Sequence, residues 1–418
     1  KYCVMRKSTL TLLFLSSLPL YAQETQQQEY SFLLVDAPAR LYTMRQSNEN
    51  FLSAYRLGFR TLANALPDTI DLRLKKFTKA KTMVLIESLS EILLYPLSHE
   101  EGHRSILTAE GIGSISAPYY NRHGTAYVNG VRDAELKNLR DTKLPTYIRL
   151  HVAGNESDYA LALRSTALLT WEKETTGILF ADIFLRKLIV TSYYFIKTDF
   201  NLPEESELER DIVGHDVLSA IRHLHRPEME FTRHTKLADL TDEEKKFHNR
   251  VRYRSLINLI DPVLLTKTGF TLKNGLKFNL AGGYGMSPFG DFIDEHFWVK
   301  WGKLNSHVYL REFQNRSTWF PAAGVEFANI PLGKRWIADA TLHGWQQPKG
   351  LDFNTTQGQW GGAVDATLKY RFFSSAKTGL GISLNLGVVA KTQGYLIEEV
   401  ALGNHVGGRF GVSIWLNN

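Results

Sequence analysis

The sequence predicts an α+β protein of two domains, an N-terminal all-α domain followed by a C-terminal antiparallel β-barrel of about eight strands. Its 418 residues are more than one ordinary domain requires. Apolar residues recur at helical spacing up to about residue 260, and from about residue 265 they alternate with polar ones as in strands. Seven of the eight tryptophans lie in this second part, where strand ends would place them at a membrane interface.

The first 22 residues predict a secretory signal peptide. Arg6 and Lys7 precede an apolar core over residues 10–20, and Ala22 ends an acceptable cleavage site. This core is too short for a transmembrane helix. The segment that follows it, residues 23–34, is rich in glutamine and is expected to be a polar tail.

Loss of this leader changes both the charge and the cysteine count. The leader contains Lys1, Arg6 and Lys7 and no acidic residue, so its removal lowers the formal net charge from +6 to +3. Such a small charge argues against a nucleic-acid partner. The only cysteine, Cys3, is also removed, which excludes a disulfide and a thiolate metal site. An exported chain without cysteine suits a Gram-negative periplasm or outer membrane.

The all-α domain is expected to cover residues 35–262. Helical spacing predicts a helix over 79–94 and, after a proline, a second one over 96–109. No window of 18 uncharged apolar residues occurs within 159–198, so this stretch predicts a buried helix pair. A further amphipathic helix is predicted over 211–225.

Residues 265–418 predict the barrel. Residues 360–373 place apolar side chains on one face and charged ones, including Asp365 and Lys369, on the other. Several strands have ten residues or more, enough for a tilted path across a bilayer. A polar lumen and a lipid-facing outside are therefore expected, although a soluble β-sandwich or a lipocalin-like barrel would show the same alternation.

One motif in the helical domain has the spacing of a metal site. His99 and His103 are four residues apart on a predicted helix, so both imidazoles lie on one face and can bind one zinc ion. Glu100 lies beside them, where it can accept a proton from an attacking water molecule. The alternative is a hydrogen-bonded histidine pair in a helical core.

The motif His99-Glu100-Glu101-Gly102-His103 resembles the H-E-x-x-H signature of the zincin metallopeptidases. Its glycine is also similar to that of the site-2-protease-like enzymes. The resemblance to zincins with a glutamate ligand implies Glu156 as the third ligand and Asp158 as a residue that orients a ligand imidazole. One branch of that clan has a glutamate four residues before its aspartate, whereas Gly154 occupies this position here.

Other residues remain candidates for the same site. Asp211 and His215 are four residues apart on the predicted 211–225 helix, so they could complete the metal site or donate a hydrogen bond to the transition state. The simpler reading of this helix is a solvated polar face. His151 is a further possible ligand, and Tyr119 and Tyr120 are possible oxyanion donors.

Two functions follow as expectations. The zincin resemblance implies a zinc metallopeptidase, anchored in the outer membrane with its helical domain in the periplasm, that hydrolyses a peptide or protein substrate. The alternative is a metal-binding scaffold without catalysis that docks a partner of an outer-membrane complex. In architecture the chain resembles the metal-binding barrel subunit of the outer-membrane protein assembly machinery of Bacteroidota. Both expectations imply outer-membrane lipid as a partner.

Overall fold

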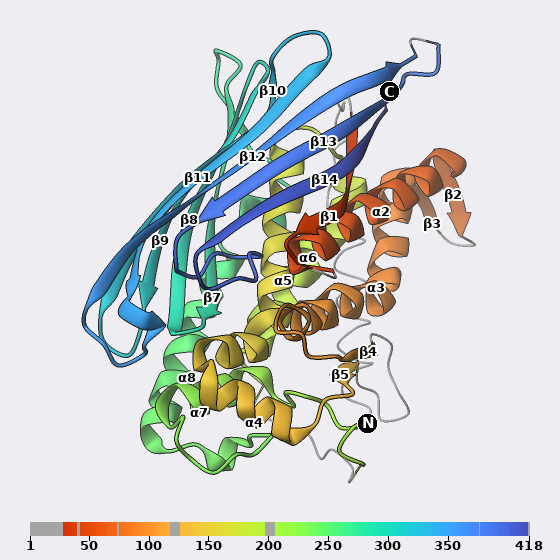
Figure 1. The fold of residues 1–418 in the computed structure, drawn as a ribbon. Coiled ribbons are helices and arrows are strands. Elements are labelled where there is room, and N and C mark those ends of the chain that lie inside the picture. Colours follow the sequence, from red (N-terminus) through yellow and green to blue (C-terminus); the bar gives the residue numbers. More distant parts are fainter. Residues whose placement is uncertain are drawn as a thin grey trace.

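The computed structural model describes residues 28–39, 42–72, 75–117, 126–196, 205–375 and 377–416. The predicted signal peptide, residues 1–22, lies outside these ranges. Seven α-helices and one large antiparallel sheet make up the described part, which confirms the α+β class. Figure 1 shows the long, tilted strands on one side of the molecule and the helices beside and below them.

The large sheet has ten strands in the order β1-β14-β13-β12-β11-β10-β9-β8-β7-β6. The eight long strands β7 to β14 follow the predicted alternation, but β1 and β6 form two edges that do not pair with each other. The prediction of a closed barrel of eight strands was therefore wrong. The strands are β1 (Gln28–Ala37), β6 (Phe270–Thr271), β7 (Lys277–Ser287), β8 (Gly290–Trp301), β9 (Leu304–Gln314), β10 (Trp319–Pro331), β11 (Trp336–Pro348), β12 (Gly358–Ser374), β13 (Leu380–Lys391) and β14 (His405–Leu416).

Strand β1 corrects the prediction of a polar tail for residues 28–34, and residues 23–27 of the predicted tail lie outside the described ranges. Its residues pair antiparallel with β14, from Gln28 opposite Leu416 to Ala37 opposite Gly408. The strand looks like a tail in the sequence because several of its side chains, such as Glu29 and Ser31, face a polar interior. Such a strand lacks the apolar stripe that identifies a half-buried strand.

The two faces of the sheet differ in chemistry. The face toward α2 and α5 borders a cavity of about 340 Å³ lined by charged and polar side chains. The opposite face, called here the outer sheet face, carries large apolar side chains exposed on alternating positions, with Trp360 71%, Leu386 62% and Val406 73% exposed. Its further members include Phe297, Trp301, Leu310, Leu342, Val364, Leu368, Leu384, Val388 and Phe410.

The helices differ from the prediction mainly at their ends. One helix runs through Pro96 where two were predicted, and the helix expected from residue 159 starts at Leu144. None of the helices in the described ranges has the length and apolar character needed to cross a membrane. The helices are α2 (Met44–Ala65), α3 (Lys79–Ala109), α4 (Asp133–Thr142), α5 (Leu144–Thr170), α6 (Thr176–Tyr193), α7 (Asp216–His225) and α8 (Asp242–Ser255), and the 3-10 turns η2 (Leu256–Leu259) and η3 (Pro262–Leu265) follow α8. Two short hairpins, β2 (Thr69–Leu72) with β3 (Lys75–Thr78) and β4 (Ile115–Ala117) with β5 (Tyr127–Asn129), flank α3.

The outer edge of β1 is satisfied by side chains of α2. Asn50 accepts a hydrogen bond from the backbone N–H of Leu33 (2.8 Å) and donates one to its carbonyl oxygen (3.0 Å). Gln46 and Arg56 donate to further β1 carbonyl groups. An unpaired strand edge would otherwise expose a row of polar groups, so α2 takes the place of a neighbouring strand.

The β7 edge is covered in a similar way by the segment around η2. The backbone N–H of Gly282 donates to the carbonyl oxygen of Ile260 (2.8 Å), and that of Tyr284 donates to Asn258 Oδ1 (2.7 Å). Helix α5 packs on the inner face of the sheet, where the Tyr159 hydroxyl donates to Asp294 of β8 (2.6 Å). The helices and the sheet therefore share one interior.

Candidate metal centre

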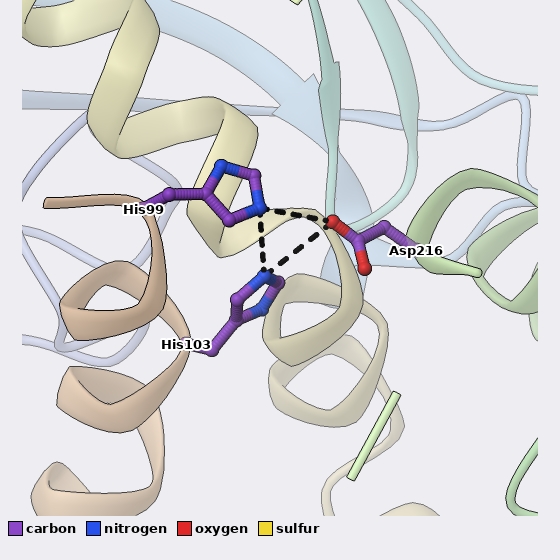
Figure 2. A group of neighbouring side chains, drawn as sticks. All are labelled: His99, His103 and Asp216. Atoms are coloured by element: carbon purple, nitrogen blue, oxygen red, sulfur yellow. Dashed lines mark hydrogen bonds and ion pairs between the residues drawn. The ribbon is translucent and has the colours of Figure 1, made fainter. Parts of the chain in front are cut away.

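Three buried side chains from two helices converge within the helical part. The Nε2 atoms of His99 and His103 on α3 lie 3.4 Å apart. The Oδ2 atom of Asp216, at the start of α7, lies 3.5 Å from the first and 3.4 Å from the second of these nitrogens (Figure 2). This group could hold a metal ion.

The second nitrogen of each imidazole is held by a neighbour on α5. His99 Nδ1 lies 2.7 Å from Asp158 Oδ2, and His103 Nδ1 lies 2.7 Å from the carbonyl oxygen of Leu150. Both acceptors favour a proton on Nδ1, so each imidazole in its neutral form keeps the Nε2 lone pair that a metal ion needs. Metal-binding histidines are commonly oriented by such partners.

Two glycines create the space for this arrangement. A Cβ added to Gly102 on α3 would lie 2.9 Å from the carbonyl carbon of Ala153 on α5, so only glycine allows the two helices to approach this closely. A Cβ added to Gly154 would lie 2.5 Å from His103 Nε2 and closer still to His99 Nε2. The empty side of Gly154 thus faces the point on which the two imidazoles converge.

The sequence did not reveal Asp216 because the helix that carries it starts later than predicted. Gly214 has a positive φ of 66°, and residues 211–215 form no helix. His215 caps α7, and its Nδ1 accepts a hydrogen bond from the Leu218 N–H (3.4 Å). Asp216 is then the first helical residue, where a carboxylate is favoured by the helix dipole. A glycine before a histidine and an aspartate was the available signal for this helix start.

Charges within the group shift the pKa values of its members. Burial lowers the pKa of His99, but the Asp158 carboxylate raises it more, so the net shift is upward. Burial raises the pKa of Asp216, yet the charges of His103 and His99 outweigh it and hold this pKa below its usual range. Burial raises the pKa of Glu100 to about 7, against the opposing effect of the two histidines. The Glu100 carboxylate therefore interacts electrostatically with His99, His103 and Asp216, although it is not one of the three possible metal ligands.

The structure separates the residues that the zincin resemblance implied. Asp158 contacts the His99 imidazole, in the position expected of an orienting residue. Glu156 lies outside the His99-His103-Asp216 group, because both of its carboxylate oxygens bind the buried guanidinium group of Arg149, at 2.9 and 2.6 Å. The carboxylate that approaches the Nε2 atoms of both histidines is that of Asp216 from α7.

The other candidates also lie outside the group. Asp211 accepts hydrogen bonds from the backbone N–H groups of Val213 (3.3 Å) and Gly214 (3.1 Å), so it shapes the turn before α7. The His215 Nε2 lies 3.2 Å from the carbonyl oxygen of Ile196. His151 is buried and stacks on His223, with ring centroids 5.5 Å apart. Tyr119 and Tyr120 lie outside the described residues.

We expect the substitution Asp158→Asn to weaken metal binding by about 10- to 100-fold, the usual cost of losing a partner that orients a ligand histidine. The measurement is a titration with Zn²⁺ in competition with a chelator. Asp182→Asn is the matched control, because Asp182 contacts the same arginine, Arg186, as Asp158 does. Equal affinity of the Asp158→Asn variant and the wild type would contradict this role.

We compared the chain with protein-family models, with curated proteins and with solved structures. None of the three comparisons found a match.

Proposed function

We propose that the protein is a zinc-dependent hydrolase of peptide bonds that is anchored in the outer membrane. The observation that carries the proposal is the convergence of His99, His103 and Asp216 beside the carboxylate of Glu100. Catalytic zinc sites commonly use three protein ligands from imidazole and carboxylate groups and leave a fourth position open.

The spacing of the three ligand atoms supports zinc. In a tetrahedral site with bonds of about 2.0–2.1 Å, the ligand atoms lie about 3.3–3.4 Å apart. The three separations here are 3.4, 3.4 and 3.5 Å. The buried Oδ2 atom of Asp216 also accepts no hydrogen bond within the described ranges. A bound cation would satisfy this oxygen. Two neutral imidazoles and one carboxylate are ligands that zinc accepts readily.

Glu100 supplies the acid–base chemistry in this proposal. Bound zinc would polarise the scissile carbonyl and lower the pKa of a water molecule at the open position. The Glu100 carboxylate accepts the proton of the attacking water and later passes it to the leaving amine.

The membrane part of the proposal is supported by the outer sheet face. Most of its exposed side chains are large and apolar, with Glu295 and Glu312 as exceptions, whereas many charged side chains line the cavity on the other face. This polarity is the reverse of that in a water-soluble sheet and matches outer-membrane strands. The strands β7 to β14 have 11–17 residues, which is long enough for a tilted path through the apolar layer. In this proposal α4, α7 and α8 lie on the periplasmic side.

The second candidate, a metal-binding scaffold for an outer-membrane complex, is favoured by the burial of the site. His99, Glu100, His103 and Asp216 are each only 1–7% exposed. Structural metal sites are closed in this way, whereas a hydrolase must admit its substrate.

The variant Glu100→Gln separates the two candidates. The experiment measures the zinc content of the purified full chain and its hydrolysis of fluorescently labelled casein. A hydrolase loses about 10²- to 10⁴-fold in rate when its general base is removed, and it retains its zinc. Glu101→Gln is the matched control, because Glu101 pairs with Arg104 on the half-buried side of the same helix. Equal casein hydrolysis by Glu100→Gln and wild type would overturn the catalytic proposal and leave the scaffold.

A further inference from the structure

We infer that the paired helices α3 and α6 form part of the membrane-embedded wall, with one outward face in contact with the acyl chains of the bilayer. This inference rests on the membrane placement of the sheet proposed above. It departs from the expectation that the whole helical part lies in the periplasm. The α3–α6 face is defined by Leu85, Leu89, Ile92 and Leu93 of α3 and by Phe184, Leu185, Leu188 and Ile189 of α6.

The α3–α6 face lacks charge and is unusually exposed for its composition. Leu89, Ile92 and Leu93 are 50%, 51% and 55% exposed, and they follow one another along a single stripe of α3. The four members from α6 are half-buried. Between residues 82 and 98 of α3 and between residues 177 and 193 of α6, every acidic or basic side chain is instead buried. These side chains are Glu87, Glu91, Asp182, Arg186 and Lys187.

Charges that point inward and apolar groups that point outward reverse the pattern of a helix in water. Within membranes, ionisable side chains face the interior of the helix bundle and pair there. The buried charges of α6 fit this description, because Arg186 bonds Asp158 (2.7 Å) and Asp182 (2.6 Å), and Lys187 forms an ion pair with Asp261 (2.7 Å).

The helices also occupy the place where the sheet is open. Helix α2 satisfies the edge of β1, and its Tyr55 hydroxyl donates to Glu87 of α3 (2.6 Å). The other carboxylate oxygen of Glu87 accepts the backbone N–H of Ala181 in α6 (3.1 Å). Lys187 of α6 reaches Asp261, next to Ile260, the residue that accepts the N–H of Gly282 in β7.

A continuous series of contacts therefore joins the two ends of the sheet, from β1 through α2, α3 and α6 to β7, which is the neighbour of the two-residue edge strand β6. The sheet, α2 and α5 line the polar cavity, and α3 and α6 pack behind α2 and α5, so the α3–α6 face lies on the outside of this series. A lipid layer that surrounds the sheet would then also surround this side of the molecule. The stripe from Leu85 to Leu93 is about 12 Å long at 1.5 Å per residue, about half of the roughly 25 Å apolar band of an outer-membrane protein.

The test uses single cysteines in the full chain, in which Cys3 is the only natural cysteine and is replaced by serine. Leu93→Cys on the α3–α6 face, Leu386→Cys on the outer sheet face and Tyr253→Cys on α8, where Tyr253 is 64% exposed, are each labelled with a fluorophore. The proteins are reconstituted in phosphatidylcholine vesicles with or without bromine on the acyl chains. We expect brominated lipid to quench the label at residues 93 and 386 to the same degree and to leave the label at 253 unchanged.

The outcomes distinguish lipid contact of the α3–α6 face from the membrane placement of the sheet, on which the inference rests. Quenching at residue 386 without quenching at 93 would overturn the lipid contact of the helices and leave the sheet in the membrane. Absence of quenching at both positions would overturn both placements. A disulfide-linked dimer of unlabelled Leu93→Cys, together with an unquenched label at residue 93 in the labelled sample, would assign the α3–α6 face to a second copy of the chain, which also overturns the inference. Leu89→Cys repeats the measurement one turn earlier and guards against a local effect of the label.

Discussion

We expect the substitution Gly154→Ala to abolish stoichiometric metal binding, with a loss of affinity larger than the about 10- to 100-fold that removal of an orienting partner costs. The added methyl group would lie 2.5 Å from His103 Nε2 and closer to His99 Nε2, where a shared ion must sit. Both imidazoles are fixed from behind by Asp158 and Leu150, so they cannot retreat together. The measurement is the metal content of the purified protein after dialysis against Zn²⁺.

The control for this prediction is Gly58→Ala on α2. An added Cβ meets no atom within 4 Å at Gly58, and alanine is favoured over glycine in a helix interior by about 1 kcal/mol. The same propensity gain applies to Gly154 in α5, so poor helix formation cannot explain a loss of metal there. Normal metal content in Gly154→Ala would show that the ion does not lie between the two histidines and Asp216.

We expect Arg149→Met to lower the free energy of unfolding by about 3–5 kcal/mol, the usual cost of breaking a buried ion pair from one side. Arg149 is fully buried, and it bonds both Glu156 oxygens and the carbonyl oxygens of Glu399 (2.7 Å) and Val400 (3.1 Å). The substitution leaves the Glu156 carboxylate without its charge partner and frees the loop between β13 and β14. Unfolding of the purified chain by denaturant measures the loss.

The double variant Arg149→Met/Glu156→Met tests the cause. Replacing both partners by apolar residues of similar length should recover most of the lost stability, because no unpaired charge remains.

The single variant Glu156→Gln should keep its full metal content, since Glu156 lies outside the metal group. Loss of metal in Glu156→Gln would restore the ligand role that the zincin resemblance implied. An Arg149→Met variant as stable as the wild type would contradict the structural role of the Arg149–Glu156 pair.

Local patterns explain what could be predicted from the sequence. The periodic apolar residues located the change from helix to strand near residue 265, because a window of a few residues is enough to tell the spacing of apolar residues in a helix from that in a strand. The pair His99 and His103 could be recognised for the same reason, since both lie within one turn of one helix. Features that depend on residues close together in the chain were thus accessible.

Features that depend on distant residues were not. The partner of β14 is β1, from the opposite end of the chain, and polar inward side chains conceal it. The carboxylate of Asp216 reaches the histidines only because Gly214 delays the start of α7. Gly154 departs from the zincin pattern in the sequence, and only the packing of α5 against α3 reveals it as the empty side of the metal group.

The pairing of β1 with β14 also constrains how the molecule is made. Residues 28–37 leave the ribosome first among the described segments, yet their neighbour in the sheet, residues 405–416, is synthesised last. The edge of β13 that faces β14 likewise waits for the end of the chain. Contacts between such distant segments form slowly, and strand edges that have not yet paired with their neighbour are prone to aggregation. The unfinished sheet therefore needs protection from aggregation until residues 405–416 are made, and removal of these residues should leave β1 and β13 without the strand that lies between them.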